Sequence, residues 1–346
     1  MRKYKLSSVA SNGIGTQKKI RFGVIGCSRT AKKNALPALL DSPFAELVMI
    51  GSRSPEDAHA CAEQFGCASY GTYEEVLANK EVDAVYISLP NSLHEEWTVK
   101  AAQAGKHVWC EKPAALTYAS AQRMVAVCRK NNVRLLEGFM FLYHPQHAKV
   151  KELIREGVLG EILNFEGRFA VPMPDAQNIR RNAGLGGGSY NDAGSYPIRA
   201  SRMIFDAEPE SVVCTLSMDP ETQVDIGAEV TLNYPMGRSA RISSAFGADF
   251  QSTYSVTGSK ARIRMERAYA VPKDMAVKIF LERDGKIEEI SVEPADHFKL
   301  MIDDFCQEIL AGKKGTKNYE EDLLAQARVL DAGRISSLEK RLVHIR

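Results

Sequence analysis

Residues 19–31 read KIRFGVIGCSRTA, an apolar β-type run that passes directly into a glycine, small polar residues and the start of a helical pattern. A dinucleotide-binding turn has glycine at its first and third places and glycine or alanine at its sixth. Gly26 and Ala31 match the first and sixth places, and Ser28 replaces the second glycine but is small enough for a pyrophosphate to approach the helix start. A plain strand-to-helix turn is the alternative. The predicted nucleotide contacts here are Gly26, Ser28, Arg29, Thr30 and Ala31.

The chain from residue 18 to about 138 alternates β-type runs with helical patterns. Ser54 precedes a proline that favours a helix start, and Thr72 with Glu75 has the spacing of a capping box. A third helix is predicted to begin at Asn91 and to stop at Gly105. Alternation at this spacing predicts a parallel sheet with helices on both faces. The predicted strands are 19–26, 46–52, 82–90, 106–113 and 133–140.

After about residue 140 the pattern changes to longer β-type runs, several of which alternate apolar and polar side chains. The sequence RDGK at 283–286 is a hairpin signal, and a glycine cluster, GLGGGSYNDAG, interrupts the runs at 184–194. We therefore expect an α/β protein whose second half is a mostly antiparallel sheet. The predicted division is a flexible tail at 1–19, a dinucleotide-binding domain at 20–139 and a substrate-binding domain at 140–346.

The composition restricts the class of protein. The 346 residues favour two domains, and the formal net charge of +2 includes no block of like charges that would indicate a nucleic-acid-binding surface. No apolar run approaches the roughly 18 to 20 residues that span a bilayer. Seven scattered cysteines without a CxxC pair argue against a disulfide framework and a structural zinc site. We expect a cytoplasmic protein that uses no metal and binds neither nucleic acid nor membrane.

The end of the second predicted strand bears on which nucleotide is bound. NAD-binding proteins place Asp or Glu there to hold the ribose 2′-hydroxyl. This chain has Ser52, Arg53 and Ser54 instead. An arginine pairs with a 2′-phosphate through two parallel hydrogen bonds, and the flanking hydroxyls add to them. Arg53 therefore predicts NADP rather than NAD, and a solvated surface arginine is the alternative.

Five stretches of the chain together resemble a known family. They are GVIGCSRTA (23–31), SLPNSLHEEW (88–97), AGKHVWCEKPAALT (104–117), HPQHAKVKELIREGVLGEI (144–162) and GGGSYNDAGSYPIRASRMIFD (186–206). They resemble, in order, the oxidoreductase family of glucose–fructose oxidoreductase, inositol dehydrogenase and the rhizopine catabolism protein (Gfo/Idh/MocA). The resemblance implies an N-terminal Rossmann domain and a C-terminal α/β domain with a large open sheet. That sheet usually forms the oligomer interface, so a homodimer or homotetramer is expected.

Within CEKPAALTY at 110–118, two charged residues and a proline stand where a buried strand ends. Burying charges there is costly unless they are paired or used, and ligands of open parallel sheets lie beyond such strand ends. By the resemblance, Lys112 matches the family's catalytic lysine beside the nicotinamide, where its ammonium hydrogen-bonds the substrate oxygen. Glu111 is expected to orient Lys112 or to contact the cofactor. The bond before Pro113 is commonly cis in this family.

The glycine block supplies the second half of the predicted site. The family carries an aspartate and, four residues later, a histidine or tyrosine, which here are Asp192 and Tyr196. That spacing places both on one helix face. The resemblance implies that Tyr196, its proton affinity lowered by Lys112, exchanges a proton with the substrate. Many inositol-type members have histidine there, so the tyrosine is a departure from that branch. Gly187 and its two neighbours are expected to border the substrate.

Four residues that follow the strand predicted at 82–90 are assigned to the cofactor. They are Leu89, Pro90, Asn91 and His94. For His94, a surface histidine next to a helix N-cap is an alternative of similar weight.

Three further residues are assigned to the substrate. Tyr143 and His144 are placed near its entrance, and Arg180 is either a ligand for a substrate phosphate or a solvated loop residue. His144 and His147 have a spacing that suggests a metal site. Pro145 and the lack of nearby carboxylates argue against one.

The resemblance is strongest to the C-3 ketoreductases of deoxysugar biosynthesis, which reduce a 3-keto nucleotide-linked sugar with NADPH. In that interpretation Tyr196 donates the proton while Lys112 polarises the carbonyl. An NADP-dependent aldose 1-dehydrogenase or a trans-dihydrodiol dehydrogenase is the alternative among enzymes, since these relatives share the lysine, aspartate and tyrosine. A non-catalytic NADP(H)-binding redox sensor is the alternative of another class. The intact set of proton-transfer groups argues against the sensor.

Overall fold

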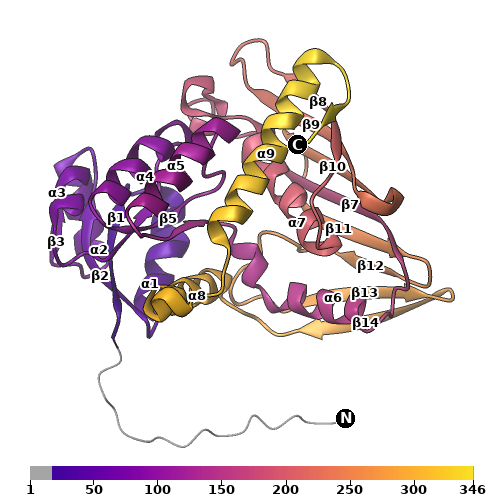
Figure 1. The fold of residues 1–346 in the computed structure, drawn as a ribbon, viewed down its shortest axis with the longest axis horizontal. Coiled ribbons are helices and arrows are strands. Elements are labelled where there is room, and N and C mark those ends of the chain that lie inside the picture. The colour runs from indigo at the N-terminus through magenta and orange to yellow at the C-terminus, as the bar shows by residue number, and fades with distance from the viewer. Residues whose placement is uncertain (1–17, 346) are drawn as a thin grey trace, which may run out of the picture.

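Two β-sheets, each packed against helices, organise the residues that the structure describes, 18–345 (Figure 1). The structure is a computed structural model. Residues 1–17 of the predicted tail lie outside the described residues. Figure 1 shows the first sheet and the second sheet side by side, with the long C-terminal helix α9 crossing between them.

The first sheet is parallel throughout, with strand order β3-β2-β1-β4-β5-β6. This order reverses direction between β1 and β4, which creates the crevice where such sheets bind ligands. The short edge strand β3 was not predicted, because its three residues are largely exposed and form no apolar run. The strands are β1 Ile20–Ile25, β2 Ala45–Gly51, β3 Ser69–Gly71, β4 Ala84–Ile87, β5 His107–Cys110 and β6 Leu135–Glu137.

The helices of this half begin where the sequence signals indicated. The Ser54 side chain accepts a hydrogen bond from the Asp57 amide, and Thr72 with Glu75 forms a complete capping box. The helix predicted from Asn91 begins with a single 3₁₀ turn, and its α-helical part starts at His94. The helices are α1 Leu36–Asp41, α2 Pro55–Gln64, α3 Tyr73–Ala78, α4 His94–Gln103 and α5 Tyr118–Lys130.

The second sheet has nine strands in the order β14-β13-β12-β11-β7-β10-β9-β8-β15. Every neighbouring pair is antiparallel except β7 and β10, so the predicted fold class is confirmed. The strands are β7 Ile162–Val171, β8 Ser211–Met218, β9 Asp225–Asn233, β10 Ser239–Phe246, β11 Gln251–Gly258, β12 Arg262–Met265, β13 Val277–Arg283, β14 Lys286–Val292 and β15 Val343–His344.

Helices cover one face of the second sheet. The alternation along β7 directs Phe165 and Phe169 into the core beneath these helices, while Glu166 and Arg168 stand exposed on the other face. The helices are α6 Pro145–Arg155 and α7 Ser195–Phe205. The sheet therefore has a covered apolar face and an open polar one.

The C-terminal helices α8 His297–Ala311 and α9 Tyr319–Glu339 return to the first sheet. Phe298 and Met301 of α8 belong to the same core cluster as β1 and α1, and Leu323 of α9 packs with α4 and α5. The predicted division, which assigns both helices to the second domain, stays a prediction: α8 packs on the first sheet, whereas α9 packs on both sheets, with Val329 and Leu330 in the core of the second. Amphipathic periodicity shows that a helix has an apolar face but not which sheet that face covers. Across residues 18–345, no helix combines the length and apolar character needed to traverse a bilayer.

Candidate active site

The turn after β5 brings Lys112 to the carboxyl end of the first sheet. The bond between Lys112 and Pro113 is cis. Two side chains hold the turn from below, since the Tyr86 hydroxyl donates to Glu111 Oε1 at 2.8 Å and Glu137 Oε1 accepts from the Ala114 amide at 2.8 Å. Hydrogen bonds on both sides of Lys112, at Glu111 and at Ala114, therefore hold this turn in place.

The Lys112 ammonium reaches the second half of the molecule. Its Nζ donates to the Asp192 carbonyl oxygen at 2.9 Å and to Asp192 Oδ1 at 3.0 Å. Consecutive residues in extended chain point in opposite directions, so Glu111 turns towards Tyr86. Asp192, and not Glu111, therefore makes the hydrogen bond to Lys112, and the alternative that Glu111 contacts the cofactor stays a prediction.

Asp192 is shared between two cations. Its other oxygen, Oδ2, accepts from Arg180 Nε at 2.6 Å, so Arg180 is neither a simple solvated residue nor directed away from the site. Burial acts to raise the pKa of Asp192, but Lys112 and Arg180 outweigh it and hold the pKa at about 2. Asp192 is therefore a carboxylate at neutral pH, and it keeps Lys112 paired.

Tyr196 lies directly beside this pair. The Lys112 ammonium sits over its ring, 4.8 Å from the centroid, and the side chain is 6% exposed. Burial raises the pKa of the hydroxyl well above its usual range, and Glu111 and Asp192 add to the increase. The prediction that Lys112 lowers the proton affinity of Tyr196 is not borne out. The phenol holds its proton at neutral pH, as a proton donor requires.

Asp192 and Tyr196 were predicted to lie on one face of a single α-helix, but they belong to two different helical segments. Residues Tyr190–Gly194 make a π-helical turn, and α7 begins only at Ser195. Lys112 nonetheless touches both side chains. The structure therefore brings together the three residues predicted to be catalytic, and their roles remain proposals.

The turn after β1 has the backbone of a nucleotide-binding turn. Gly26 has φ of +100°, and a Cβ there would lie 2.8 Å from the Ser88 carbonyl oxygen and from the Leu89 side chain. The Ser28 hydroxyl accepts from the Ala31 amide at 3.1 Å and bonds the Ser88 hydroxyl, so it caps the helical turn that starts there. Among the other residues assigned to this turn and the β4 loop, Ala31 and Leu89 are buried, Thr30 and Pro90 are half-buried, and Arg29 is exposed.

The tip of β2 presents Arg53 to solvent. The two flanking serines are less available than predicted. Ser52 is 8% exposed, and the Ser54 hydroxyl accepts from the Asp57 amide at 3.1 Å and donates to Glu56 at 2.7 Å. The Ser54 hydroxyl is thus already used by the α2 cap, and its contact with a 2′-phosphate stays a prediction. Arg53 remains the group that fits a phosphate there.

The glycine block bends tightly against its own loop. Gly186 and Gly188 have φ of +75° and +110°, and a Cβ on Gly187 would overlap the Arg180 backbone. The carbonyl oxygen of Gly186 accepts from Asn91 Nδ2 at 2.8 Å, which connects the β4 loop to the second half of the molecule. Close packing explains the need for glycine here, and a role of Gly187 beside the substrate stays a prediction.

Three predicted site residues are buried or half-buried. His94 is completely buried with its ring nitrogens facing backbone carbonyl oxygens, so the prediction of a cofactor contact is wrong. His144 is 1% exposed and caps α6 through the Gln146 amide, and Tyr143 packs against the core cluster that contains α8. Tyr143 is half-buried, and a place for Tyr143 or His144 at the substrate entrance stays a prediction.

Two residues were missed. Tyr86 and Glu137 hold the Lys112 turn, and burial raises the pKa of Glu137 to about 7. Glu137 ends β6, so the strand-end argument applied to Glu111 would have found it. Tyr86 lies inside an apolar strand, where the sequence has no signal of its role. Within residues 18–345, no cluster of three or more His, Cys, Asp or Glu side chains is arranged to hold a metal ion.

Comparison with known proteins identifies the family. The model described as "Oxidoreductase family, NAD-binding Rossmann fold" matches residues 20–139, and the "GFO/IDH/MocA C-terminal domain" matches residues 147–264. The chain belongs to the GFO/IDH/MocA oxidoreductase family. The predicted family is thereby confirmed.

Several proteins with similar sequences are named as sugar reductases or sugar dehydrogenases. A dTDP-3,4-didehydro-2,6-dideoxy-alpha-D-glucose 3-reductase from Actinomadura kijaniata is 37% identical over 91% of this chain and 95% of its own. D-xylose 1-dehydrogenase (NADP(+)) 2 from Haloferax volcanii is 33% identical over 90% of this chain and 95% of its own. The crystal structure of KijD10, a 3-ketoreductase from A. kijaniata, in complex with NADP and TDP-benzene, has a TM-score of 0.89 and 36% identity. That match covers 92% of this chain and 98% of KijD10.

The depressed pKa of Asp192 makes stability depend on pH. We expect Asp192→Asn to lower the free energy of unfolding by about 2 kcal/mol at pH 7, because it leaves Lys112 and Arg180 without their shared carboxylate. The folded pKa of about 2 lies below the ordinary value of 3.8, so this stabilisation is present above pH 3.8 and is lost as the pH falls towards 2. Urea unfolding of wild type and variant at a series of pH values measures it. Glu161→Gln, at an exposed position, is the control, and a gap between wild type and D192N that is independent of pH would contradict the assignment.

Proposed function

We propose that this chain is an NADP(H)-dependent sugar oxidoreductase that reduces the C-3 keto group of a nucleotide-linked sugar. The observation that carries the proposal is the contact of Lys112 with Asp192 and Tyr196 at the carboxyl end of the first sheet. The crystallised relative KijD10 is a 3-ketoreductase seen with NADP and TDP-benzene, and its solved forms include a lysine-to-alanine mutant and a tyrosine-to-phenylalanine mutant.

The residues of the first sheet suit NADP. The guanidinium of Arg53 is exposed at the tip of β2 and has the donor geometry for a 2′-phosphate. The Gly26 turn leads into the N-terminus of a helical segment, a place that favours the pyrophosphate. When bound, NADPH supplies the hydride. The chain itself binds and orients the two reactants and provides the proton.

The protonation states of the site favour reduction. The Lys112 ammonium donates a hydrogen bond to the carbonyl oxygen of the sugar and stabilises the negative charge that develops on it. The Tyr196 hydroxyl, whose pKa is raised, then donates its proton to that oxygen. Asp192 accepts a hydrogen bond from Lys112 through Oδ1 and from Arg180 through Oδ2, and so it holds the Lys112 ammonium in place. Tyr196 would be a poor base for the opposite reaction, because an alcohol must give its proton to a phenolate.

The alternatives are separated by substrate. An NADP-dependent aldose 1-dehydrogenase has support from the D-xylose dehydrogenase of H. volcanii, and a trans-1,2-dihydrobenzene-1,2-diol dehydrogenase from Xenopus tropicalis is 29% identical over 71% of this chain. A non-catalytic sensor would bind NADP(H) and turn over no sugar.

The proposal includes a reducing cytoplasmic setting, since all seven cysteines are free thiols.

The first test compares reactions and variants. We expect NADPH oxidation with a 3-keto nucleotide sugar, and turnover of free xylose or glucose lower by at least about 100-fold. Tyr196→Phe should lower kcat by about 100-fold and Lys112→Ala by about 1,000-fold, with both still binding NADPH, because general acid catalysis and charge stabilisation contribute about these factors. Stopped-flow absorbance at 340 nm measures the rates. Robust oxidation of free aldoses with NADP⁺ would favour the dehydrogenase, and unchanged rates in both variants would contradict the mechanism.

The second test concerns the cofactor. Arg53→Ala should weaken NADPH binding by roughly 10- to 100-fold and leave NADH binding within about twofold, because the pair with the 2′-phosphate is charge-assisted and bidentate. Fluorescence titration with each nucleotide measures both affinities. Arg283→Ala, at another exposed arginine on β13 of the second sheet, is the matched control. Equal loss of both nucleotides would assign Arg53 a role other than recognition of the phosphate.

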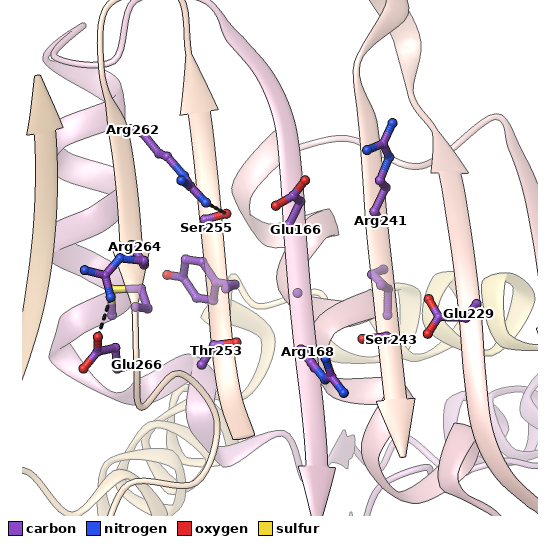
Figure 2. Close-up of a pocket in the computed structure, with 14 residues that line it drawn as sticks. Glu166, Arg168, Glu229, Arg241, Ser243, Thr253, Ser255, Arg262, Arg264 and Glu266 are labelled. Atoms are coloured by element: carbon purple, nitrogen blue, oxygen red, sulfur yellow. Dashed lines mark hydrogen bonds and ion pairs between the residues drawn. The ribbon is translucent and has the colours of Figure 1, made fainter. Parts of the chain in front are cut away.

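The open face of the second sheet is the proposed oligomer interface. Figure 2 shows acidic and basic side chains standing side by side on β7 and on β9 to β12. These side chains line a groove of about 610 Å³. A surface that carries both signs can pair with a second copy of itself across a twofold axis. The charged residues around the groove are Glu166, Arg168, Glu229, Arg241, Arg262, Arg264 and Glu266.

Charge reversal tests this interface. Arg168→Glu combined with Arg241→Glu should convert the oligomer to monomers, because β7 and β10 are adjacent at the middle of the sheet and the new charges would repel across the interface. Sedimentation velocity measures the change. Lys130→Glu, at an exposed position at the end of α5, should leave the oligomer intact. A monomeric wild type at tens of micromolar would contradict the proposed homo-oligomer.

A further inference from the structure

His94 connects the ends of two adjacent strands. It is the first residue of α4 and is completely buried. Its Nδ1 lies 2.9 Å from the Pro113 carbonyl oxygen in the turn after β5, and its Nε2 lies 3.0 Å from the Leu89 carbonyl oxygen in the loop after β4. One imidazole therefore bridges two loops that the backbone ladder between β4 and β5 does not reach.

Both loops belong to the site described above. Pro113 directly follows Lys112, so the carbonyl that His94 contacts is one residue beyond the lysine. Leu89 packs against the Gly26 turn, since a Cβ on Gly26 would lie 2.8 Å from the Leu89 side chain. The His94 ring therefore connects the turn that carries Lys112 to the loop that packs against the Gly26 turn.

The burial of His94 has an electrostatic cost. Burial lowers its pKa and Lys112 lowers it further, while the two carbonyl oxygens act in the opposite direction. A neutral ring has one N–H and so donates to one carbonyl at a time. An apolar ring would fill the same space without this cost, but it would leave both carbonyl oxygens without a donor. The polar ring therefore contributes a hydrogen bond to one of the two carbonyl oxygens, which packing alone does not require.

We propose that His94 is a positioning residue that sets the place of the Lys112 ammonium by anchoring the Pro113 carbonyl to the β4 loop. The proposal rests on the proposed function, because the group that is positioned is the lysine of the reaction. Tyr86 and Glu137 hold the turn at Glu111 and Ala114, and His94 holds it between them. A displacement of about 1 Å in a group that contacts the reacting atoms costs about 100-fold in rate.

The two ring nitrogens can be tested separately. In His94→Asn the amide nitrogen takes the place of Nδ1 and can still donate to Pro113, whereas in His94→Gln it takes the place of Nε2 and can donate to Leu89. His94→Phe retains the ring shape and removes both contacts. The matched control is His147→Phe, since His147 is 1% exposed and its ring likewise faces the Tyr254 hydroxyl and the Ala268 carbonyl, in the core of the second sheet.

We expect a graded loss in kcat for reduction of the 3-keto nucleotide sugar. H94N should stay within about fivefold of wild type, H94Q should fall about 30-fold and H94F about 100-fold, while KM for the sugar and the Kd for NADPH change by less than about threefold. H147F should lose thermal stability but keep kcat. A kcat of H94Q equal to or above that of H94N would overturn the proposal. So would equal kcat losses in H94F and H147F. If H94F fails to fold, the order of H94N and H94Q still decides.

A crystal structure of H94Q separates this proposal from the proposed function. We expect Lys112 Nζ to move by about 1 Å or more from Asp192 Oδ1 relative to the wild-type crystal structure, whatever substrate the enzyme uses. Wild type that reduces no nucleotide sugar would contradict the function but leave this displacement measurable. An unmoved lysine in H94Q would overturn the positioning role even if the reaction is as proposed.

Discussion

The ion pair between Lys112 and Asp192 is the contact on which the rest of the structure depends. Each charge is largely buried, with 11% and 21% of the two side chains exposed, and each comes from a different half of the molecule. A charge in such a place is costly unless its partner is present. The pair therefore holds the end of β5 against the residues that follow the glycine block.

Helix α9 maintains that position. Its first half packs on α4 and α5 of the first sheet, and its second half joins the core of the second sheet. Gln326 Nε2 donates to the Ser195 carbonyl oxygen at 3.0 Å, directly before Tyr196, and Asp322 accepts from Arg199 and Arg202 of α7. The helix that carries the tyrosine is thus tied to the helix that spans both sheets (Figure 1).

The site separates the protonation states of neighbouring groups by their surroundings. Two cations hold Asp192 ionised, whereas burial and the nearby Glu111 and Asp192 raise the pKa of the Tyr196 phenol, whose hydroxyl donates to Met140 Sδ at 3.7 Å. The cation at Lys112 touches both. Environments that push the pKa values of adjacent groups apart are how one site holds a stabilising charge and a proton donor together.

The sequence by itself determined the alternation of strands and helices, the helix caps at Ser54 and Thr72, and the delivery of Lys112 to a strand end. These follow from local periodicity and from turn chemistry, which operate within a few residues. Only the tertiary structure decided that Lys112 pairs with Asp192, 80 residues away, rather than with Glu111 beside it, and that His94 is buried. Those outcomes depend on which elements pack together, and no pattern along the chain records that.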